Sequence, residues 1–283
     1  MNPPERQLRR QAWRRLARHA RNAAYRVASI VDWVGRAHRG TVLPPAHLRI
    51  YYYRKSDPQA FIRACEIVRT EVISRGLRAE HRVLDIGSGV GNLALGLVDY
   101  LRGGYDGVEI HSAAVAWCQR AITSRYPTFR FHHADLASEA YNPGGRELAS
   151  TYRFPFADQE FDFIFLGSVF THMLPDATAN YVREIARMLR PGGVCAASFF
   201  LLNDESRPAV NAGCSFISFA TELAAGLCRV HDATRPEAAV AIDESYVRRL
   251  YEDAGLSLRD VRRGQWWSGL ADDQDVVTAV MSS

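Results

Sequence analysis

The sequence predicts an α/β fold in which a mostly parallel, doubly wound sheet of seven strands carries helices on both faces. Three observations predict it. Short apolar strands alternate with helical segments from residue 82 onward, a glycine-rich turn follows the first strand, and the composition is that of an ordinary globular chain, with 47% apolar and 23% charged residues. Parallel strands need crossover connections of this length, so the alternation favours parallel neighbours.

The individual elements are read from apolar runs and the residues that punctuate them. The expected strands are residues 82–86, 107–110, 129–133, 161–166, 194–201, 257–261 and 275–281. The expected helices lie between Asp57, as N-cap, and Gly76, at 92–101, at 113–124, near 177–189, and between a capping Asp243 and Gly255. Residues 203–242 lack this rhythm and are expected to form a helical insertion over one edge of the sheet.

The first forty residues differ in charge from the rest of the chain. Residues 1–40 hold ten arginines against Glu5 and Asp32, a net charge of +8; with +4 for the whole chain, the other 243 residues carry −4. Gly40 and the Pro44-Pro45 pair indicate a boundary. We therefore expect a basic helical extension at 1–40 and one domain at 41–283, and the acidic balance of that domain does not indicate a polyanion binder.

Residues 8–34 predict one amphipathic helix within the extension. Apolar side chains fall on one side and six arginines on the other: Arg10, Arg14, Arg15, Arg18, Arg21 and Arg26. Such a helix could lie on an anionic membrane surface and bring the protein to a membrane-linked substrate. Docking on the body of the protein, a targeting presequence and phosphate contacts are alternative roles.

Other features of the sequence indicate where in the cell the protein is expected. The chain has no apolar run of about 20 residues and no uninterrupted apolar core near its start, so neither a membrane span nor a secretory signal is expected. Its five cysteines are scattered without CxxC spacing, which argues against a disulfide framework or a zinc site. We expect a cytoplasmic protein, at most peripheral at the inner face of the membrane.

The strongest chemical signal is the glycine-rich turn. Residues 83–92 read VLDIGSGVGN, so a buried strand delivers Asp85 to a GxGxG turn that opens a helix. Glycine is needed where the backbone turns sharply and a ligand approaches closely. A dinucleotide fingerprint would have a third glycine where Asn92 stands, and a phosphate-binding P-loop would continue with GK[ST]. Both are disfavoured.

Acidic residues end the next two predicted strands. Glu109 follows Gly87 by 22 residues, and a carboxylate at that strand end can accept hydrogen bonds from both hydroxyls of a ribose. Asp135 follows the third strand, where it could accept from an exocyclic adenine amine. The adjacent His132 and His133 point to opposite faces of a strand, so no metal site is expected there.

These residues stand in order with further motifs. The later ones are FPF at 154–156, FDF at 161–163, SVFTHM at 168–173 and LRPGG at 189–193. The series resembles the class I methyltransferases that bind S-adenosylmethionine, and looks closest to bacterial members that methylate small molecules or glycans. The resemblance covers residues 58–201 firmly and 240–283 more loosely. About eighteen residues separate Asp135 from the FPF element, where many relatives have only a few, which predicts an extra loop at 137–153 near the site.

The resemblance implies a Rossmann-like fold, S-adenosyl-L-methionine as cofactor, and methyl transfer. The cofactor-binding residues it implies are Asp85, Gly87, Ser88, Gly89, Glu109, Ile110, Asp135, Leu136, Ser168 and Val169. Ser168 and Val169 would border the methyl donor. His172 is the candidate general base for an alcohol or phenol acceptor, because its ordinary pKa suits that task. Alternatively, His172 caps a helix or packs beside the cofactor.

The predicted function is transfer of a methyl group to oxygen on a small-molecule, glycan or lipid-linked acceptor. Two alternatives remain: a nucleic-acid methyltransferase, which only the arginine-rich tail favours, and a non-catalytic S-adenosylmethionine-binding partner protein. An amino-methylating nucleic-acid enzyme would be expected to carry an Asn/Asp-Pro-Pro-aromatic element after the fourth strand, where this chain reads LGSVF at 166–170. Two aromatic groups, Tyr51 to Tyr53 and Trp266 with Trp267, could line a substrate site or equally serve packing.

Overall fold

The structure is a computed structural model that describes residues 42–53, 57–139, 141–269 and 273–282. The chain divides into two compact units, Met1–Cys65 and Glu66–Ser283. The predicted amphipathic helix at 8–34 and the boundary at Gly40 lie outside the described residues. The proposed division into an extension and one domain therefore stays a prediction.

The described part of the first unit contains a short helix, α2 (Ala46–Tyr53), and the start of α3 (Pro58–Ser74). Asp57 caps α3 as predicted, because its two carboxylate oxygens accept hydrogen bonds from the amides of Gln59 at 3.0 Å and Ala60 at 3.1 Å. After α3 ends at Ser74, Gly76 adopts a φ of +105°. A capping carboxylate at the start and a glycine after the end thus define this helix, as the sequence predicts.

The second unit is built on the predicted sheet of seven strands. They are β1 (Val83–Ile86), β2 (Tyr105–Glu109), β3 (Phe129–His133), β4 (Phe161–Leu166), β5 (Leu189–Phe199), β10 (Leu256–Arg262) and β11 (Asp275–Met281). Their order is β10-β11-β5-β4-β1-β2-β3, and only β11 runs antiparallel to its neighbours. All four residues of β1 are buried, as expected for a central parallel strand covered on both faces.

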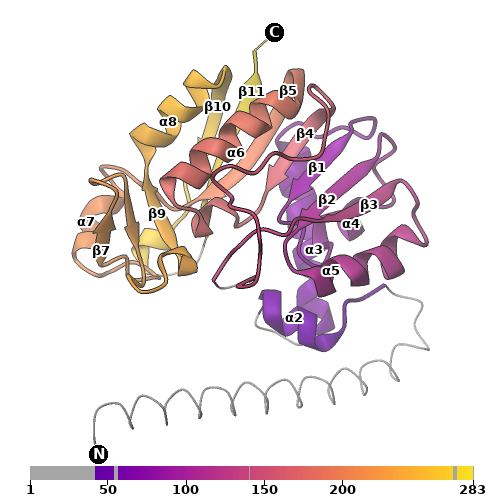
Figure 1. Cartoon of the computed structure of the whole chain (residues 1–283), viewed down its shortest axis with the longest axis horizontal. Helices are drawn as coiled ribbons and strands as arrows, with labels where there is room; N and C mark the ends of the chain where they lie inside the picture. Colours follow the sequence, from indigo (N-terminus) through magenta and orange to yellow (C-terminus); the bar gives the residue numbers. More distant parts are fainter. Residues whose placement is uncertain (1–41, 54–56, 140, 270–272, 283) are drawn as a thin grey trace, which may run out of the picture. The chain divides into compact units, whose positions relative to one another are not determined.

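Helices connect the strands in the expected places. They are α4 (Asn92–Leu97), α5 (Ser112–Cys118), which continues as a π-helix (Gln119–Thr123), α6 (Pro175–Met188) and α8 (Glu244–Asp253). Figure 1 shows α6 and α8 side by side, and the Tyr246 hydroxyl on α8 donates to the carbonyl of Pro175 on α6. Asp243 caps α8 as predicted by accepting from the Tyr246 amide.

The prediction of a helical insertion at 203–242 was wrong. This segment contains one short helix, α7 (Ser206–Asn211), and a 3-10 turn (Pro236–Ala238). Its strands β7 (Thr221–Leu223), β8 (Cys228–Val230) and β9 (Val240–Asp243) join β6 (Leu201–Leu202), which precedes the segment, in a second sheet with the order β6-β9-β8-β7. Its hairpin turns through Ala224 and Ala225 at φ of +53° and +51°. Alanine favours helices, so the sequence gives little sign of a turn there.

Candidate functional site

The glycine-rich turn lies where β1 ends and α4 begins. Gly87, Gly89 and Gly91 have φ values of +78°, +52° and +74°, in the left-handed region that side chains disfavour. The amides of Gly87 and Ser88 both donate to the carbonyl of Val108 on β2, at 2.8 and 3.0 Å. The turn is therefore held by the neighbouring strand, and its positive φ angles explain why glycine stands at these positions.

Glu109 contacts this turn directly. One carboxylate oxygen of Glu109 accepts a hydrogen bond from the amide of Gly89 at 2.8 Å, and the other accepts from the amide of His111 at 2.8 Å. The side chain is buried at the carboxyl end of β2. The structure thus brings together the glycine turn and the acidic residue that the sequence predicts as ligands of one cofactor.

The segment after β4 meets the turn from the other side. A Cβ atom added at Gly87 would overlap the Cγ2 atom of Val169, so the Val169 side chain packs against the turn only because residue 87 has no side chain. Ser168 adopts a φ of +57°, and its amide donates to the hydroxyl of Ser198 at 2.7 Å. Strained backbone of this kind is often found at binding sites. Gly87, Gly89, Glu109 and Val169 therefore lie at one place, where the parallel strands β1, β2 and β4 end.

Asp85 points to a different partner. It is buried on β1, and its carboxylate accepts a hydrogen bond from the hydroxyl of Tyr105, at the start of β2. Burial raises the pKa of Asp85 to about 7; the hydrogen bond from Tyr105 opposes this rise, and the negative charge of Glu109 adds to it. In this structure Asp85 supports the strand that leads into the turn, and its predicted contact with the cofactor stays untested.

Asp85 gives a pH prediction. An acid whose pKa rises on folding keeps its proton in the folded chain while the unfolded chain releases it, so the unfolding free energy falls as pH rises from about 4 to about 7. About three pKa units correspond to a loss on the order of 4 kcal/mol. Asp85→Asn should remove this loss, as urea unfolding of both proteins at several pH values would show. Parallel stability curves for the two proteins would contradict the prediction.

Asp135 and the segment after β3 form a folded-back loop. The Asp135 carboxylate accepts from the Arg146 guanidinium at 2.6 Å and from the Asn142 side chain at 3.2 Å. The hydrogen bond from Arg146, followed by the one from Asn142, lowers the pKa of Asp135. Leu136 is buried and forms a β-bridge with Glu147. The predicted extra loop at 137–153 is therefore closed onto the end of β3 by the same carboxylate that the sequence assigns to adenine.

His172 ends the 3-10 helix Phe170–His172 that follows β4. Its Nδ1 lies 3.0 Å from the carbonyl oxygen of Glu237, in the insertion, and its Nε2 lies 3.2 Å from the hydroxyl of Tyr141, in the loop after β3. Burial lowers the pKa of His172, although backbone hydrogen bonds oppose the effect. The imidazole is therefore neutral at pH 7. Tyr141 and Glu237 are site residues that the sequence reasoning missed, because each lies more than thirty positions from His172.

Solved structures show the same fold. A protein of Pyrococcus horikoshii matches with a TM-score of 0.55 at 17% identity, over 83% of this chain and 96% of that one. A Burkholderia thailandensis 1,6-didemethyltoxoflavin-N1-methyltransferase, with bound 1,6-didemethyltoxoflavin and S-adenosylhomocysteine, matches with a TM-score of 0.50 at 20% identity, over 92% and 90%. A Methanosarcina mazei S-adenosylmethionine-dependent methyltransferase matches with a TM-score of 0.50 at 21% identity, over 75% of this chain and 97% of that one.

The sequence comparisons match part of the chain to methyltransferases. A family described as a methyltransferase domain matches residues 84–197, which run from β1 into β5 and contain the turn, Glu109 and Val169. Over this segment, about 40% of the chain, the protein is similar to methyltransferases, and the solved structures share its fold. An uncharacterized methyltransferase of Schizosaccharomyces pombe is 32% identical over 124 residues, 43% of this chain; the match spans 41% of that relative's length.

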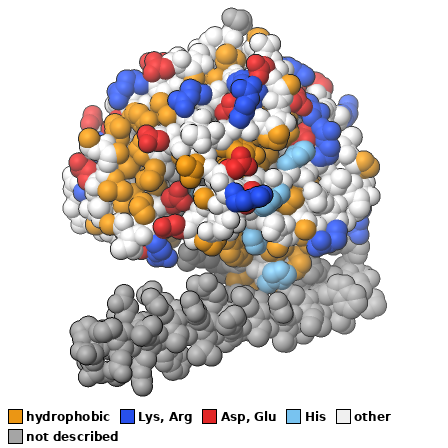
Figure 2. Space-filling model, in the orientation of Figure 1, with side chains coloured by type: hydrophobic (Ala, Val, Ile, Leu, Met, Phe, Trp, Pro, Cys, Tyr) orange, Lys and Arg blue, Asp and Glu red, His pale blue; other side chains and the backbone are white. Residues whose placement is uncertain are grey.

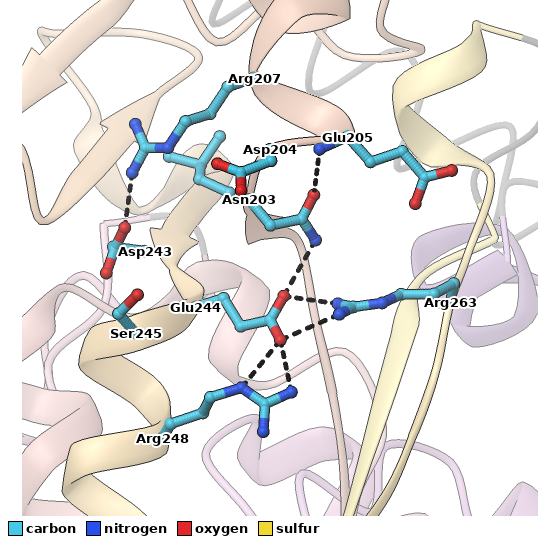
Figure 3. A pocket seen from close by; sticks show the side chains of 10 residues that line it. Asn203, Asp204, Glu205, Arg207, Asp243, Glu244, Ser245, Arg248 and Arg263 are labelled. Carbon is cyan, nitrogen blue, oxygen red and sulfur yellow. Dashed lines mark hydrogen bonds and ion pairs between the residues drawn. The ribbon is translucent and has the colours of Figure 1, made fainter.

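A hollow drawn in Figure 3 lies outside the matched segment, and none of the predicted cofactor residues lines it. It has a volume of about 400 Å³ and is lined by residues of the insertion, α8 and the segment after β10. The Glu244 carboxylate accepts from Arg263 at 2.6 and 2.9 Å, and from Arg248 and Asn203. Burial alone would raise the pKa of Glu244, but these bonds lower it to about 2. The arginines here are paired with carboxylates, so this hollow is an ion-pair network joining the insertion to α8.

Two further sequence hypotheses concern Trp266 and the histidine pair. Trp266 is 1% exposed, and its indole N–H donates to Asp275 at 2.8 Å, so it packs in the core and does not line a substrate site. His132 contacts the Asp106 carboxylate at 2.8 Å, whereas His133 contacts the carbonyl of Ile110 at 3.1 Å. Across residues 42–53, 57–139, 141–269 and 273–282, no group of three or more His, Cys, Asp or Glu side chains is arranged to hold a metal ion.

Proposed function

We propose that this protein transfers a methyl group from S-adenosyl-L-methionine to a hydroxyl oxygen of a small-molecule, glycan or lipid-linked acceptor. One observation carries the proposal: the glycine turn, Glu109 and Val169 meet where the parallel strands end, within the segment that matches the methyltransferase family. Open α/β sheets bind their ligands at this edge. The Burkholderia enzyme of the same fold holds a small-molecule acceptor and S-adenosylhomocysteine together.

The residues present suit this cofactor. The Ser88 hydroxyl, between Gly87 and Gly89 in the turn, is buried without a hydrogen-bond partner among the described residues, so a polar group of a ligand could pair with it. A carboxylate has about four acceptor positions. The hydrogen bonds that Glu109 accepts from two backbone amides are therefore compatible with further hydrogen bonds from ribose hydroxyls. Ile110, Asp135 and Leu136 would lie beside the adenine, Ser168 and Val169 would border the methyl donor, and Asp85 would support the turn from β1. The cofactor, when bound, supplies a methyl group that its sulfonium already activates.

His172 is the general base of this proposal. It lies one 3-10 turn after Val169, and its amide donates to the carbonyl of Val169 at 2.9 Å. A hydroxyl acceptor must lose its proton as the methyl arrives, and a neutral imidazole can take that proton. The hydrogen bond from Nδ1 to a backbone carbonyl fixes which ring nitrogen is basic.

The direct test follows labelled methyl from the cofactor into fractionated cell extract. Soluble, lipid-linked and nucleic-acid pools are incubated separately with the full-length protein, and the pool that gains label identifies the acceptor class. We expect label in the soluble or lipid-linked pool, stable to mild base because a methylated hydroxyl is an ether. His172→Gln should lower the transfer rate about 100-fold, within the range for general bases, and leave S-adenosylhomocysteine affinity unchanged. Label in the nucleic-acid pool alone, or in none, would overturn the proposal.

We also propose that residues 8–34 bring the enzyme to anionic membranes. Each arginine near an anionic leaflet can contribute about 1 kcal/mol, and six lie on one side of the predicted helix. On the face in Figure 2, basic and acidic side chains are interspersed. None of the described helices is long and apolar enough to cross a bilayer.

Sedimentation with vesicles tests the membrane proposal. The full chain should sediment with phosphatidylserine vesicles at low salt and be released at high salt, because the attraction is electrostatic. It should not sediment with phosphatidylcholine vesicles. Replacing the six arginines by glutamine in the full chain should abolish sedimentation. Equal behaviour of the two proteins would show that residues 8–34 do not provide the membrane contact.

A further inference from the structure

The only basic nitrogen of His172 already has a hydrogen-bond donor beside it. The Glu237 carbonyl can only accept, so His172 Nδ1 carries the proton and donates to it across 3.0 Å. In a neutral imidazole the other nitrogen, Nε2, is then an acceptor. The Tyr141 hydroxyl, 3.2 Å away, therefore donates to Nε2, with the two rings edge to face at 5.3 Å.

This arrangement is held from three separate elements. His172 follows β4, Tyr141 belongs to the loop after β3, and Glu237 belongs to the 3-10 turn of the insertion. The Glu237 carboxylate in turn accepts from the amide of Glu139 and the hydroxyl of Ser138, two and three residues before Tyr141. The loop and the insertion are thus hydrogen-bonded to each other, and this contact holds the Tyr141 hydroxyl beside the His172 imidazole.

Tyr141 and His172 also lie next to the proposed site of methyl transfer. Val169, whose side chain abuts Gly87 of the glycine turn, accepts from the His172 amide. Asn142, the neighbour of Tyr141, donates to Asp135 at the end of β3. A proton that leaves an acceptor hydroxyl at this place reaches His172 Nε2 either by displacing Tyr141 or by passing through its hydroxyl.

We propose that Tyr141 is a catalytic residue that relays the proton from the acceptor hydroxyl to His172. This inference rests on the proposed function. As the acceptor oxygen bonds to the methyl carbon, the carbon–sulfur bond breaks and the sulfur keeps its electron pair. The acceptor hydroxyl gives its proton to the Tyr141 oxygen, and Tyr141 gives its own proton to His172 Nε2. The positive charge of the sulfonium thereby ends on the imidazolium, which later releases its proton to water.

Tyr141→Phe separates the relay from direct catalysis by His172. With the extract pool that accepts label from the wild-type protein, the relay predicts that Tyr141→Phe lowers kcat about 100-fold or more and leaves S-adenosylhomocysteine affinity unchanged. The double variant Tyr141→Phe/His172→Gln should be no slower than either single variant, since the two residues act as a unit. Tyr100→Phe is the matched control, because its hydroxyl also donates one hydrogen bond, but to the backbone carbonyl of Leu77 at 3.1 Å and not to His172, and it should keep full activity.

If the wild type transfers label and Tyr141→Phe keeps or exceeds its rate, the relay is overturned while the proposed function stands. If the wild type transfers no label to any pool, the proposed function fails and the relay fails with it. Nitrogen NMR of the protein without cofactor gives a readout that does not need the acceptor. His172 should show a protonated Nδ1 and an unprotonated Nε2, whose signal moves in Tyr141→Phe but not in Tyr100→Phe. A protonated Nε2 in the neutral ring would overturn the relay.

Discussion

Gly87→Ala should lower the affinity for S-adenosylhomocysteine by about 100-fold or more, equivalent to roughly 2.7 kcal/mol. The new Cβ would overlap Val169 Cγ2, and the residue would stay at a φ of +78°. Valine has a short, stiff side chain that cannot rotate away easily, so either the turn or the segment after β4 must shift. Both of these segments border the proposed cofactor site. Isothermal titration calorimetry of the full-length variant measures the effect.

Gly192→Ala is the matched control for this substitution. Gly192 has nearly the same φ, +76°, but a Cβ there would meet nothing within 4 Å. Both variants carry the backbone strain of a left-handed alanine, roughly 1–2 kcal/mol, and only Gly87→Ala adds the overlap with Val169. Only Gly87→Ala should lose affinity. Wild-type affinity in Gly87→Ala would mean that the cofactor does not depend on the close approach of Gly87 and Val169.

Asp275→Ala should lower the free energy of unfolding by about 3–5 kcal/mol. The Asp275 carboxylate is 1% exposed and accepts from the amides of Leu201 at 2.9 Å and Gly264 at 3.0 Å, and from the Trp266 indole N–H at 2.8 Å. Alanine would leave these buried donors unpaired, at about 1–3 kcal/mol for each. The carboxylate thus joins β11 to the start of the second sheet and to the loop after β10.

Urea unfolding, followed by tryptophan fluorescence and by circular dichroism, measures this loss. Asp275→Asn keeps one acceptor oxygen and should lose less than the alanine variant. Asp99→Ala removes an exposed carboxylate that pairs with Arg69 at 2.9 Å, and such a surface pair contributes less than about 1 kcal/mol. If Asp275→Ala were no less stable than Asp99→Ala, the assigned role of Asp275 would be wrong.

The sequence predicted those parts of the fold whose signals are local. The seven strands, the caps Asp57 and Asp243, and the GxGxG turn each depend on residues within a few positions of one another. The glycine spacing also predicts the backbone conformation of the turn, because three glycines in five residues favour the three positive φ angles that the structure shows. Glu109 could be placed beside it because consecutive parallel strands end at the same edge of a sheet.

Other features depend on contacts that no local pattern shows. The insertion forms a second sheet because Cys228–Val230 pairs with β9 and with β7, although the intervening alanines favour helix. Asp135 follows its strand as predicted, but its pairing with Arg146 depends on how the loop folds back. The partners of His172 lie 31 and 65 positions away along the chain, and come together only when the loop and the insertion are in place.

Calorimetric titration of the full-length protein with S-adenosylhomocysteine and, separately, with NAD shows which of the two cofactors the turn binds. The GxGxG turn is shared in outline by both cofactor classes, while the absence of a third glycine at Asn92 and the position of Glu109 favour the first. We expect saturable one-to-one binding of S-adenosylhomocysteine, weakened in Glu109→Ala by about 1–3 kcal/mol, and no heat from NAD. Saturable binding of NAD without any response to S-adenosylhomocysteine would contradict this expectation.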